Sequence, residues 1–181
     1  MGYTGGVDLG GTKIQTVVVD EHGEVAGQSR RPTPTSGTPA GVAAEIAGAL
    51  KDAAAEAGIK TSSLEGIGVG SPGNVDDGAG TVSAAKNLPG WDGSFDMRKA
   101  LEKSCGAAVR LGNDVQVATD AEFALGSGQP YNSLLGVFWG TGVGGGIVLD
   151  GRPWIGRDAA GEIGHIVVRR GGALCGCGRR G

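Results

Sequence analysis

The feature that most constrains the fold is a pair of short apolar runs joined by two glycines near the start of the chain. Residues 3–9 and 13–19 flank a turn at Gly10 and Gly11, which is typical of an antiparallel hairpin. A further turn predicts that residues 24–31 return as a third strand. A sheet that begins with consecutive hairpins is not a simple dinucleotide-binding unit, because in that unit strands alternate with helices from the start.

Beyond the hairpins, helix and strand patterns alternate and predict an α/β fold. A helix begins with Thr38 as cap and Pro39 in its first position, and Gly58 ends it. A segment of turn-forming residues, 126–132, predicts a boundary between domains of residues 1–126 and 127–181. The other expected elements are a strand over 67–70, a hairpin around 77–78, a helix over 95–104, a strand over 108–111, a helix from 113–114 to 126 with Val117, Ala121 and Leu125 on one face, and a hairpin of 134–139 and 147–149 around the glycine-rich turn 140–146.

Composition narrows the function classes. The net charge is -3 and no long basic block occurs, so the electrostatics favour neither a nucleic-acid partner nor a membrane surface. No leader pattern and no run of about 18 apolar residues is present, which predicts a cytoplasmic protein. Cys105, Cys175 and Cys177 make a poor disulfide framework and favour a reduced compartment. Cys105 is expected to be a small buried residue.

The first glycine turn has the composition of a phosphate site. Gly10 and Gly11 let backbone amides face an anion, Thr12 adds a hydroxyl, Lys13 adds a charge, and Asp8 could hold a hydrated Mg²⁺. The alternative is an ordinary hairpin turn with a solvent-facing lysine.

A second glycine turn lies in "GTGVGGG", residues 140–146. Gly140, Gly142 and Gly145 have the spacing of a dinucleotide fingerprint, but apolar β-type residues flank both sides, where that fingerprint requires a helix. The Walker pattern is also absent. We therefore expect two backbone cradles, one per domain, that hold one polyphosphate from opposite sides.

Taken together, the motifs resemble those of ROK-family sugar kinases, the group that includes bacterial glucokinases. They occur in the family's order and span essentially the whole chain: "DLGGTK" (8–13), "KNLPGW" (86–91), "GNDV" (112–115), "GTGVGGG" (140–146), "GEIGH" (161–165) and "CGCG" (175–178). The resemblance implies an actin-like or hexokinase-like (ribonuclease H-like) pair of α/β domains that closes over ATP and a hexose, with the second domain incomplete.

The resemblance also implies roles for individual residues. Asp114 resembles the general base, and its place at a helix start favours the ionised form that a base needs. The alternative role for Asn113 and Asp114 is helix capping. The sugar ligands that the resemblance implies are Asn87, Asn113, Asp114, Glu162 and His165. The ATP and Mg²⁺ ligands are Asp8, Gly10, Gly11, Thr12, Lys13, Gly140, Thr141, Gly142 and Gly144.

Two of these assignments have local alternatives. Asn87 could be a turn residue before Leu88, Pro89 and Gly90. Trp91 could stack on a sugar or serve as a buried anchor.

His165, Cys175 and Cys177 form a candidate Zn²⁺ site. Two thiolates and an imidazole suit zinc, but a structural site needs four ligands. The resemblance places the fourth, a cysteine, just after "CGCGRRG", where this sequence ends at Gly181. We therefore expect the chain to be truncated.

The expected function is ATP-dependent phosphorylation of a hexose, with glucose converted to glucose 6-phosphate in glycolysis, by a protein that is a homodimer at full length. N-acetylglucosamine, N-acetylmannosamine, fructose and allose are alternative substrates. The main alternative function is a sugar-sensing transcriptional regulator of the same family, although the first strand begins almost at Met1 and leaves no room for a DNA-binding domain. A zinc-held interaction module is a third.

Overall fold

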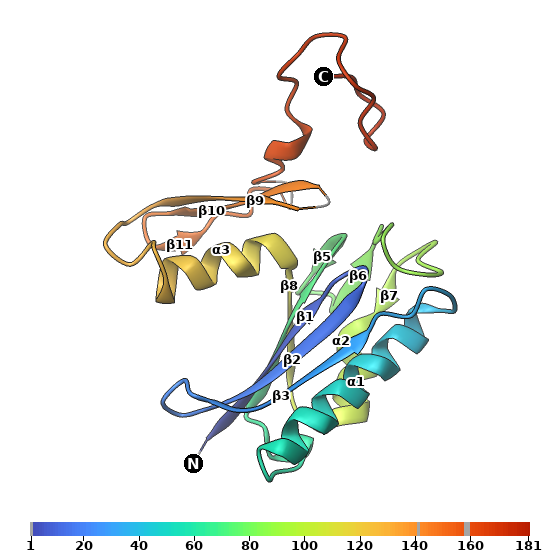
Figure 1. Ribbon diagram of the computed structural model, residues 1–181, viewed down its shortest axis with the longest axis vertical. Helices are drawn as coiled ribbons and strands as arrows, with labels where there is room; N and C mark the ends of the chain where they lie inside the picture. Colours follow the sequence, from blue (N-terminus) through green and yellow to red (C-terminus); the bar gives the residue numbers. More distant parts are fainter. Residues whose placement is uncertain (1, 141, 158–159) are drawn as a thin grey trace. The chain divides into compact units, whose positions relative to one another are not determined.

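The structure is a computed structural model that describes residues 2–140, 142–157 and 160–181 (Figure 1). It has two compact units, of which the first ends at Asp114 and the second covers Val115–Gly181. The boundary that we predicted after residue 126 lies at the other end of a helix that belongs, apart from its first residue, to the second unit.

The first unit is built on a five-stranded sheet with the order β3-β2-β1-β4-β8. The predicted hairpins form the antiparallel pairs β1/β2 and β2/β3, and β1/β4 and β4/β8 are parallel. The sheet is therefore mixed, with its parallel part at β1, β4 and β8. The strands are β1 (Tyr3–Leu9), β2 (Lys13–Asp20), β3 (Val25–Pro32), β4 (Gly66–Ser71) and β8 (Val109–Asn113).

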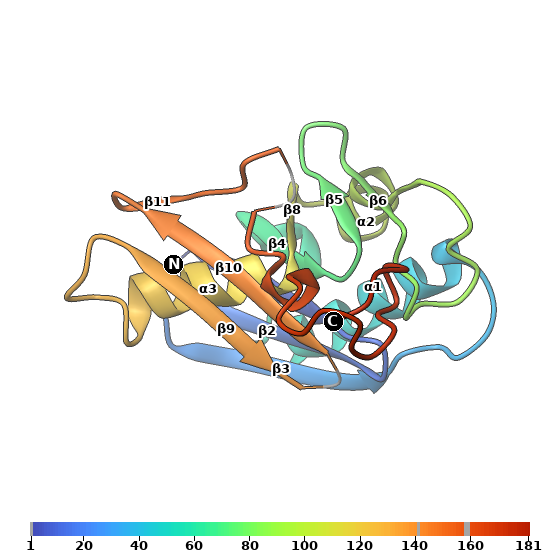
Figure 2. The same cartoon turned by 90° about the horizontal axis from the view of Figure 1, so that it is seen from above.

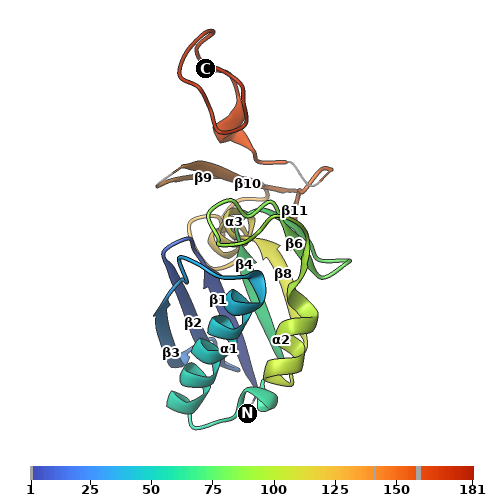
Figure 3. The same cartoon turned by 90° about the vertical axis from the view of Figure 1, so that its right-hand side faces the viewer.

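Two helices, α1 (Pro39–Glu56) and α2 (Met97–Cys105), cover one face of this sheet (Figure 3). As predicted, Thr38 caps α1, and its Oγ1 accepts a hydrogen bond from the Gly41 amide at 3.3 Å. The apolar side of α1 and the inner face of the sheet form one core. Its fully buried members include Leu9, Ile14, Ile46, Leu50, Met97 and Leu101.

A small second sheet, β5-β6-β7, lies between β4 and α2 in the chain. Its strands are β5 (Asn74–Asp76), β6 (Thr81–Ser83) and β7 (Phe95–Asp96), and a short 3₁₀ helix, η1 (Thr61–Ser63), precedes β4. Phe95 was expected to begin the helix but pairs with Val82 in this sheet. The helix begins two residues later because the Asp96 carboxylate accepts a hydrogen bond from the Lys99 amide at 3.0 Å, which makes Asp96 the cap.

The second unit consists of α3 (Asp114–Leu125) from Val115 on, a three-stranded sheet and a long irregular tail (Figure 2). The sheet contains β9 (Leu134–Trp139), β10 (Val143–Leu149) and β11 (Arg152–Pro153). The tail contains one 3₁₀ helix, η2 (Ile163–His165), and an isolated bridge between Leu174 and Arg180. The predicted turn over 140–146 is shorter than expected, because strand pairing resumes at Val143 opposite Trp139.

Helix α3 turns its polar side inward. Gln116 Nε2 donates to the Ile147 carbonyl of β10 at 3.1 Å, and the buried residue of this helix is Thr119. Val117 is 42% exposed and Leu125 is 82% exposed, so the apolar face that we expected from the sequence faces outward. In the described part of the chain no helix is both long and apolar enough to cross a membrane.

Candidate functional site

The predicted site residues of the first unit lie at or just beyond the carboxyl ends of β1 and β8, which are strands of the parallel part of the sheet drawn in Figure 1. Asp8 of β1 pairs with Gly70 of β4, and Gly70 pairs with Gly112 of β8. Neighbouring strands lie about 4.8 Å apart, so Asp8 lies roughly 10 Å from the residue that precedes Asn113 and Asp114. Ligands of α/β sheets bind at this edge, where the loops that leave the strands converge.

Two hydrogen bonds hold the first glycine turn in place. The Gly10 amide donates to the Lys13 carbonyl at 2.9 Å, and the Thr33 hydroxyl donates to the Gly10 carbonyl at 2.6 Å. Gly11, Thr12 and Asp8 are exposed. The turn therefore has a fixed shape and presents its outer side, next to a carboxylate, to solvent.

Asn87 lies directly against this turn. A Cβ atom added to Gly11 would lie 3.2 Å from the Asn87 Cβ, so a larger residue at Gly11 would push the two segments apart. The Asn87 segment is held by buried neighbours, because Leu88 is 6% exposed and the Trp91 Nε1 donates to the Val82 carbonyl at 3.0 Å. Of the two roles that we considered for Trp91, the structure favours the buried anchor.

Asn113 and Asp114 occupy the junction between β8 and α3. Asn113 is the last residue of β8, opposite Ser71, and its Nδ2 is 3.4 Å from the Gly73 carbonyl. Asp114 is half-buried and is the acidic residue in the first turn of α3. A carboxylate in the first turn of a helix is stabilised in its ionised form.

A supporting residue that the sequence did not reveal is Asp77, in the turn between β5 and β6. Its carboxylate accepts from the Leu111 amide at 2.9 Å and pairs with Arg98 at 2.6 Å and Arg110 at 3.0 Å. Burial alone would raise the pKa of Asp77, but these hydrogen bonds outweigh it and hold the pKa below its ordinary value. We had interpreted Asp77 as a turn residue, and nothing in the sequence connects it to two distant arginines.

In the second unit, Gly140 and Gly142 of the second glycine turn lie between the end of β9 and the start of β10. The Gly140 amide donates to the Gly142 carbonyl at 2.9 Å. A Cβ atom at either glycine would have no neighbour within 4 Å, so the space around this part of the backbone is open. Thr141, a predicted phosphate ligand, lies outside the described residues.

The glycines after this turn are packed rather than open. Gly144 lies in β10, and a Cβ atom there would come within 2.7 Å of Val115 on α3. Gly161 has a φ of +83°, and a Cβ atom there would lie 2.5 Å from the Gly145 carbonyl oxygen. Glycine in this strand and in the "GEIGH" segment therefore allows α3 and the tail to approach the backbone of β10. Gly144 remains a predicted phosphate ligand, with a structural role beside it.

His165 contacts a predicted sugar ligand, Glu162, and a predicted zinc ligand, Cys175. Its Nε2 is 3.5 Å from the Glu162 carboxylate, and its Nδ1 is 3.3 Å from the Cys175 sulfur. The donor atoms of His165, Cys175 and Cys177 all lie within 4.8 Å of one another. Tetrahedral zinc, with bonds of about 2.0 Å to nitrogen and 2.3 Å to sulfur, holds its ligand atoms roughly 3.5 Å apart. The three donors therefore fit three corners of a zinc site.

The chemistry of Cys177 also suits a metal ligand. A hydrogen bond with the Arg179 backbone, together with Cys175 and His165, lowers the pKa of the Cys177 thiol to about 7. The thiolate, which is the form that binds metal, is therefore abundant at neutral pH.

A second carboxylate of α3 belongs to Asp120. Burial raises the pKa of Asp120, and the hydrogen bond that it accepts from Gln116 Nε2 at 2.7 Å offsets part of this effect. A carboxyl group with a raised pKa is itself a candidate for proton transfer, so Asp120 is the natural comparison for Asp114.

Known proteins are similar to this chain over nearly its whole length. The family model described as "ROK family" matches residues 4–181. A glucokinase of Streptomyces coelicolor is 35% identical over 182 residues, and an N-acetylmannosamine kinase of Haemophilus influenzae is 33% identical over 176 residues. These alignments cover 100% and 97% of this chain and 55% and 56% of the relatives.

A solved structure extends the comparison to the fold. A ROK family glucokinase from Streptomyces griseus, in complex with glucose and AMPPNP, superposes with a TM-score of 0.85 at 37% identity. The match covers 99% of this chain and 55% of that one. The chain belongs to the ROK family and has its actin-like ATPase fold, and it spans about half the length of the curated relatives that it matches.

Proposed function

We propose that the protein transfers a phosphoryl group from ATP to a hydroxyl of a hexose. The observation that carries the proposal is the convergence of Asp8, the Gly10–Lys13 turn, Asn87 and Asn113–Asp114 at one edge of the sheet. Phosphoryl transfer needs donors on the phosphates, a metal ion, and a carboxylate that orients the attacking hydroxyl and takes its proton. Each of these groups has a candidate residue at or beside this edge.

In the first unit, the Gly10–Lys13 turn would bind phosphate oxygens. Asp8 would hold hydrated Mg²⁺, which would neutralise part of the triphosphate charge. Asn87 and Asn113 would bind sugar hydroxyls through their amide groups. Asp114 would accept the proton of the attacking hydroxyl, since its carboxylate lies at the start of α3 directly after Asn113.

In the second unit, the open backbone at Gly140 and Gly142 would bind phosphate oxygens, together with Thr141. Glu162 and His165 would bind sugar hydroxyls, and the 3.5 Å contact between them would fix the orientation of the imidazole. Gly144 would contribute mainly by letting α3 approach β10.

Glucose is the substrate that we propose, since both the S. coelicolor relative and the S. griseus structure are glucokinases. The N-acetylmannosamine kinase relative is nearly as similar, at 33% identity. The substituent on carbon 2 of the sugar substrate is therefore the feature to test. We place the reaction in the cytoplasm, because the three cysteines Cys105, Cys175 and Cys177 are free thiols.

The test is a coupled assay of ADP formation, with the protein as it is expressed from its gene, ATP, Mg²⁺ and a panel of hexoses. We expect hexose-dependent ADP formation with the highest kcat/KM for glucose. A preference for N-acetylmannosamine would correct the substrate only. Binding to DNA that weakens when hexose is added, without ADP formation, would contradict the proposal and favour a regulator.

We also propose that His165, Cys175 and Cys177 hold structural Zn²⁺. Bound zinc would cross-link η2 to the segment of Cys175 and Cys177 within the tail, and so would hold His165 and Glu162 in place. Native mass spectrometry measures the metal content directly. We expect Cys175→Ser to lose zinc and Cys105→Ser, a matched change at a buried cysteine outside the group, to retain it. Equal zinc content in both variants would contradict the site.

A further inference from the structure

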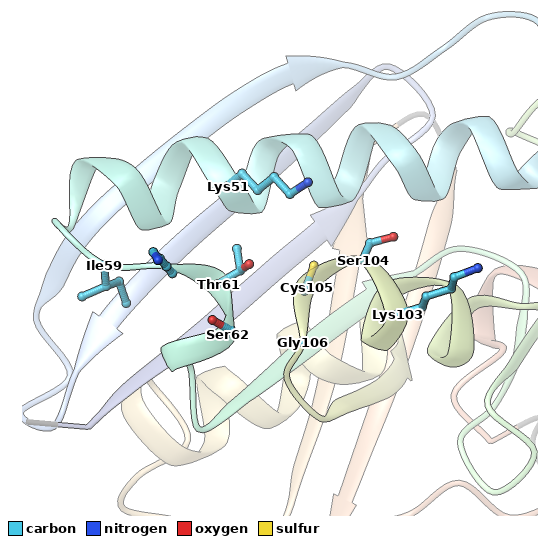
Figure 4. A pocket seen from close by; sticks show the side chains of 9 residues that line it. Lys51, Ile59, Thr61, Ser62, Lys103, Ser104, Cys105 and Gly106 are labelled. Atoms are coloured by element: carbon cyan, nitrogen blue, oxygen red, sulfur yellow. The ribbon is translucent and has the colours of Figure 1, made fainter.

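The first unit has a pocket at the end of its sheet that the proposed reaction does not use (Figure 4). Its volume is about 510 Å³, which lies in the range of small-molecule sites. Figure 4 shows Lys51 on α1 at one side of the pocket, and Thr61, Ser104 and Cys105 at the other. Lys60 and Lys103 complete its charged lining.

The pocket lies far from the candidate site. Glu65, which follows η1, donates its amide to the carbonyl of Tyr3 at 2.8 Å, so the pocket is at the edge where β1 and β4 begin. The Gly10 turn follows the other end of β1, which has 7 residues. At about 3.3 Å per residue, the two edges are roughly 20 Å apart. A molecule in the pocket could not touch the groups at the carboxyl edge.

The pocket concentrates positive charge without a counter-charge. Lys51, Lys60 and Lys103 come from three different segments, and none of its lining residues is acidic. In the part of the chain that the structure describes, none of these lysines forms an ion pair, whereas Arg31 and Arg98 each pair with carboxylates. Three like charges around one hollow repel one another, and an anion between them would remove that repulsion.

The acidic residues close in sequence to these three lysines have other partners. Glu56 accepts from the Gln28 amide at 2.9 Å, and Glu102 accepts from the Val109 amide at 3.1 Å. Asp52, next to Lys51, pairs with Arg31 at 2.8 Å. Each of these carboxylates therefore has another partner, and none of them lines the pocket.

Stabilisation by the end of a helix explains the position of only one of the three lysines. Lys103 lies in the last turn of α2, where backbone carbonyl groups favour a cation. Lys51 lies more than one turn before the end of α1, and Lys60 lies in the loop after it, so the helix dipole does not explain why all three surround one pocket.

The remaining lining suits a ligand with one charged and one less polar part. The hydroxyl groups of Thr61 and Ser62 can donate hydrogen bonds, while that of Ser104 already donates to the Ala100 carbonyl at 2.9 Å. Cys105 is 2% exposed, and burial raises the pKa of its thiol, so it forms an apolar wall and is not a nucleophile.

We propose that this pocket binds a small phosphate-bearing anion, of the size of a sugar phosphate, between Lys51, Lys60 and Lys103. A phosphate group with two negative charges and three acceptor oxygens forms charge-assisted hydrogen bonds with ammonium groups, and the flexible stems of lysine side chains let them turn toward it. The pocket volume leaves room for a sugar-sized remainder beside Ile59 and Cys105. This site is additional to the proposed kinase site, and its occupancy does not depend on turnover.

The test is a titration of the 181-residue chain, followed by amide resonances in ¹H–¹⁵N NMR spectra, at low ionic strength without ATP. The two probes are glucose 6-phosphate and inorganic phosphate. We expect shifts in the amides of Lys60, Thr61, Ser62 and Gly106. The triple variant K51Q/K60Q/K103Q should bind roughly tenfold more weakly or worse, because each change removes a charge-assisted contact.

Two controls assign the result to the pocket. Lys99→Gln removes one charge from α2 outside the pocket and should leave the shifts unchanged. Lys13→Gln removes the lysine of the Gly10 turn and should also leave them unchanged, which separates this site from the proposed kinase site. If the triple variant does not fold, Lys60→Gln in the loop carries the comparison, with an expected weakening of about threefold.

Either probe can support the proposal. Shifts with glucose 6-phosphate alone would identify a phosphomonoester, and equal shifts with both probes would identify the phosphate group by itself. Two outcomes would overturn the proposal: the pocket amides do not shift with either probe at millimolar concentration, or they shift equally in the triple variant and in Lys99→Gln.

Discussion

The two units use apolar residues in opposite ways. In the first unit, α1 buries Val42, Ile46 and Leu50 completely against the sheet. In the second unit, Leu125 of α3 is 82% exposed and Trp139 of β9 is 87% exposed. The first unit therefore encloses its core, whereas much of the apolar surface of the second faces outward.

Different contacts therefore stabilise the two units. Side-chain burial dominates in the first, where burying one Leu or Ile contributes about 1.5–3 kcal/mol. In the second, backbones meet at glycines, as at Gly144 against Val115 and Gly161 against Gly145. The comparison shows that a row of apolar residues in the sequence predicts an amphipathic helix. It does not predict whether another element of the fold covers the apolar face of that helix.

The largest expected effect is on the core of the first unit. Leu50→Ala should lower the free energy of unfolding by about 3 kcal/mol, because it removes a fully buried side chain from a closed core. Leu135→Ala in the second unit is the matched change, at a side chain that is 55% exposed, and should cost about 0.5 kcal/mol or less. Urea unfolding followed by circular dichroism measures both. Equal losses would contradict the contrast between the units.

A second prediction concerns the glycine contacts. Gly161→Ala combines a positive φ with a Cβ clash against the Gly145 carbonyl, and should destabilise the second unit by about 2 kcal/mol. Hydrogen exchange of the β10 amides measures this local effect. Gly142→Ala is the control, because a Cβ atom there has no neighbour within 4 Å. If the two variants exchange alike, backbone contact at Gly161 does not stabilise this unit.

The third prediction concerns the Asp77 network. Asp77→Asn should destabilise the first unit by about 1 kcal/mol, since this carboxylate is partly exposed and solvent screens its ion pairs. The folded-state pKa is lowered, so the contribution is present above the ordinary pKa of an aspartate and is lost as the pH falls through the lowered value. Unfolding curves between neutral and strongly acidic pH should converge for the two proteins. Asp76→Asn, which changes the neighbouring carboxylate, is the control, and an equal effect would contradict a specific role for Asp77.

The smallest expected effect is on thiol chemistry. With a pKa of about 7, Cys177 in metal-free protein should be alkylated by iodoacetamide at a rate that reaches half its maximum near pH 7 and levels off about one pH unit higher. Cys105 should stay unmodified until the first unit unfolds, because it is 2% exposed. Peptide mass spectrometry follows each cysteine separately. A Cys177 rate that keeps rising well above pH 8 would show an ordinary thiol.

Local signals in the sequence predicted most of the fold of the first unit. Thr38 and Pro39 fixed the start of α1, and the turn at Gly10 and Gly11 fixed the first hairpin. These features depend on neighbouring residues, which a sequence displays directly. The predicted start of α2 was wrong by two residues. Phe95 pairs with Val82 of β6, and Asp96 is the N-cap of the helix.

The remaining features depend on contacts between distant segments. The sequence showed glycines over 140–146 but not that Gly144 faces Val115, which is why the turn was predicted too long. For the candidate site, the motifs predicted Asp8, Asn87 and Asn113, and the structure supplies their common edge. Asp77 could not be predicted, because its partners Arg98 and Arg110 lie far along the chain.

The most direct test of the proposed function compares two carboxylates on the same helix. Asp114→Asn and Asp120→Asn are identical, nearly isosteric changes, and kcat for hexose-dependent ADP formation is measured for the protein as expressed from its gene. We predict that Asp114→Asn lowers kcat by about 10³-fold with little change in hexose affinity, as for loss of a general base, and that Asp120→Asn stays near the wild-type value. An unchanged kcat in Asp114→Asn, or a larger loss in Asp120→Asn, would contradict the account.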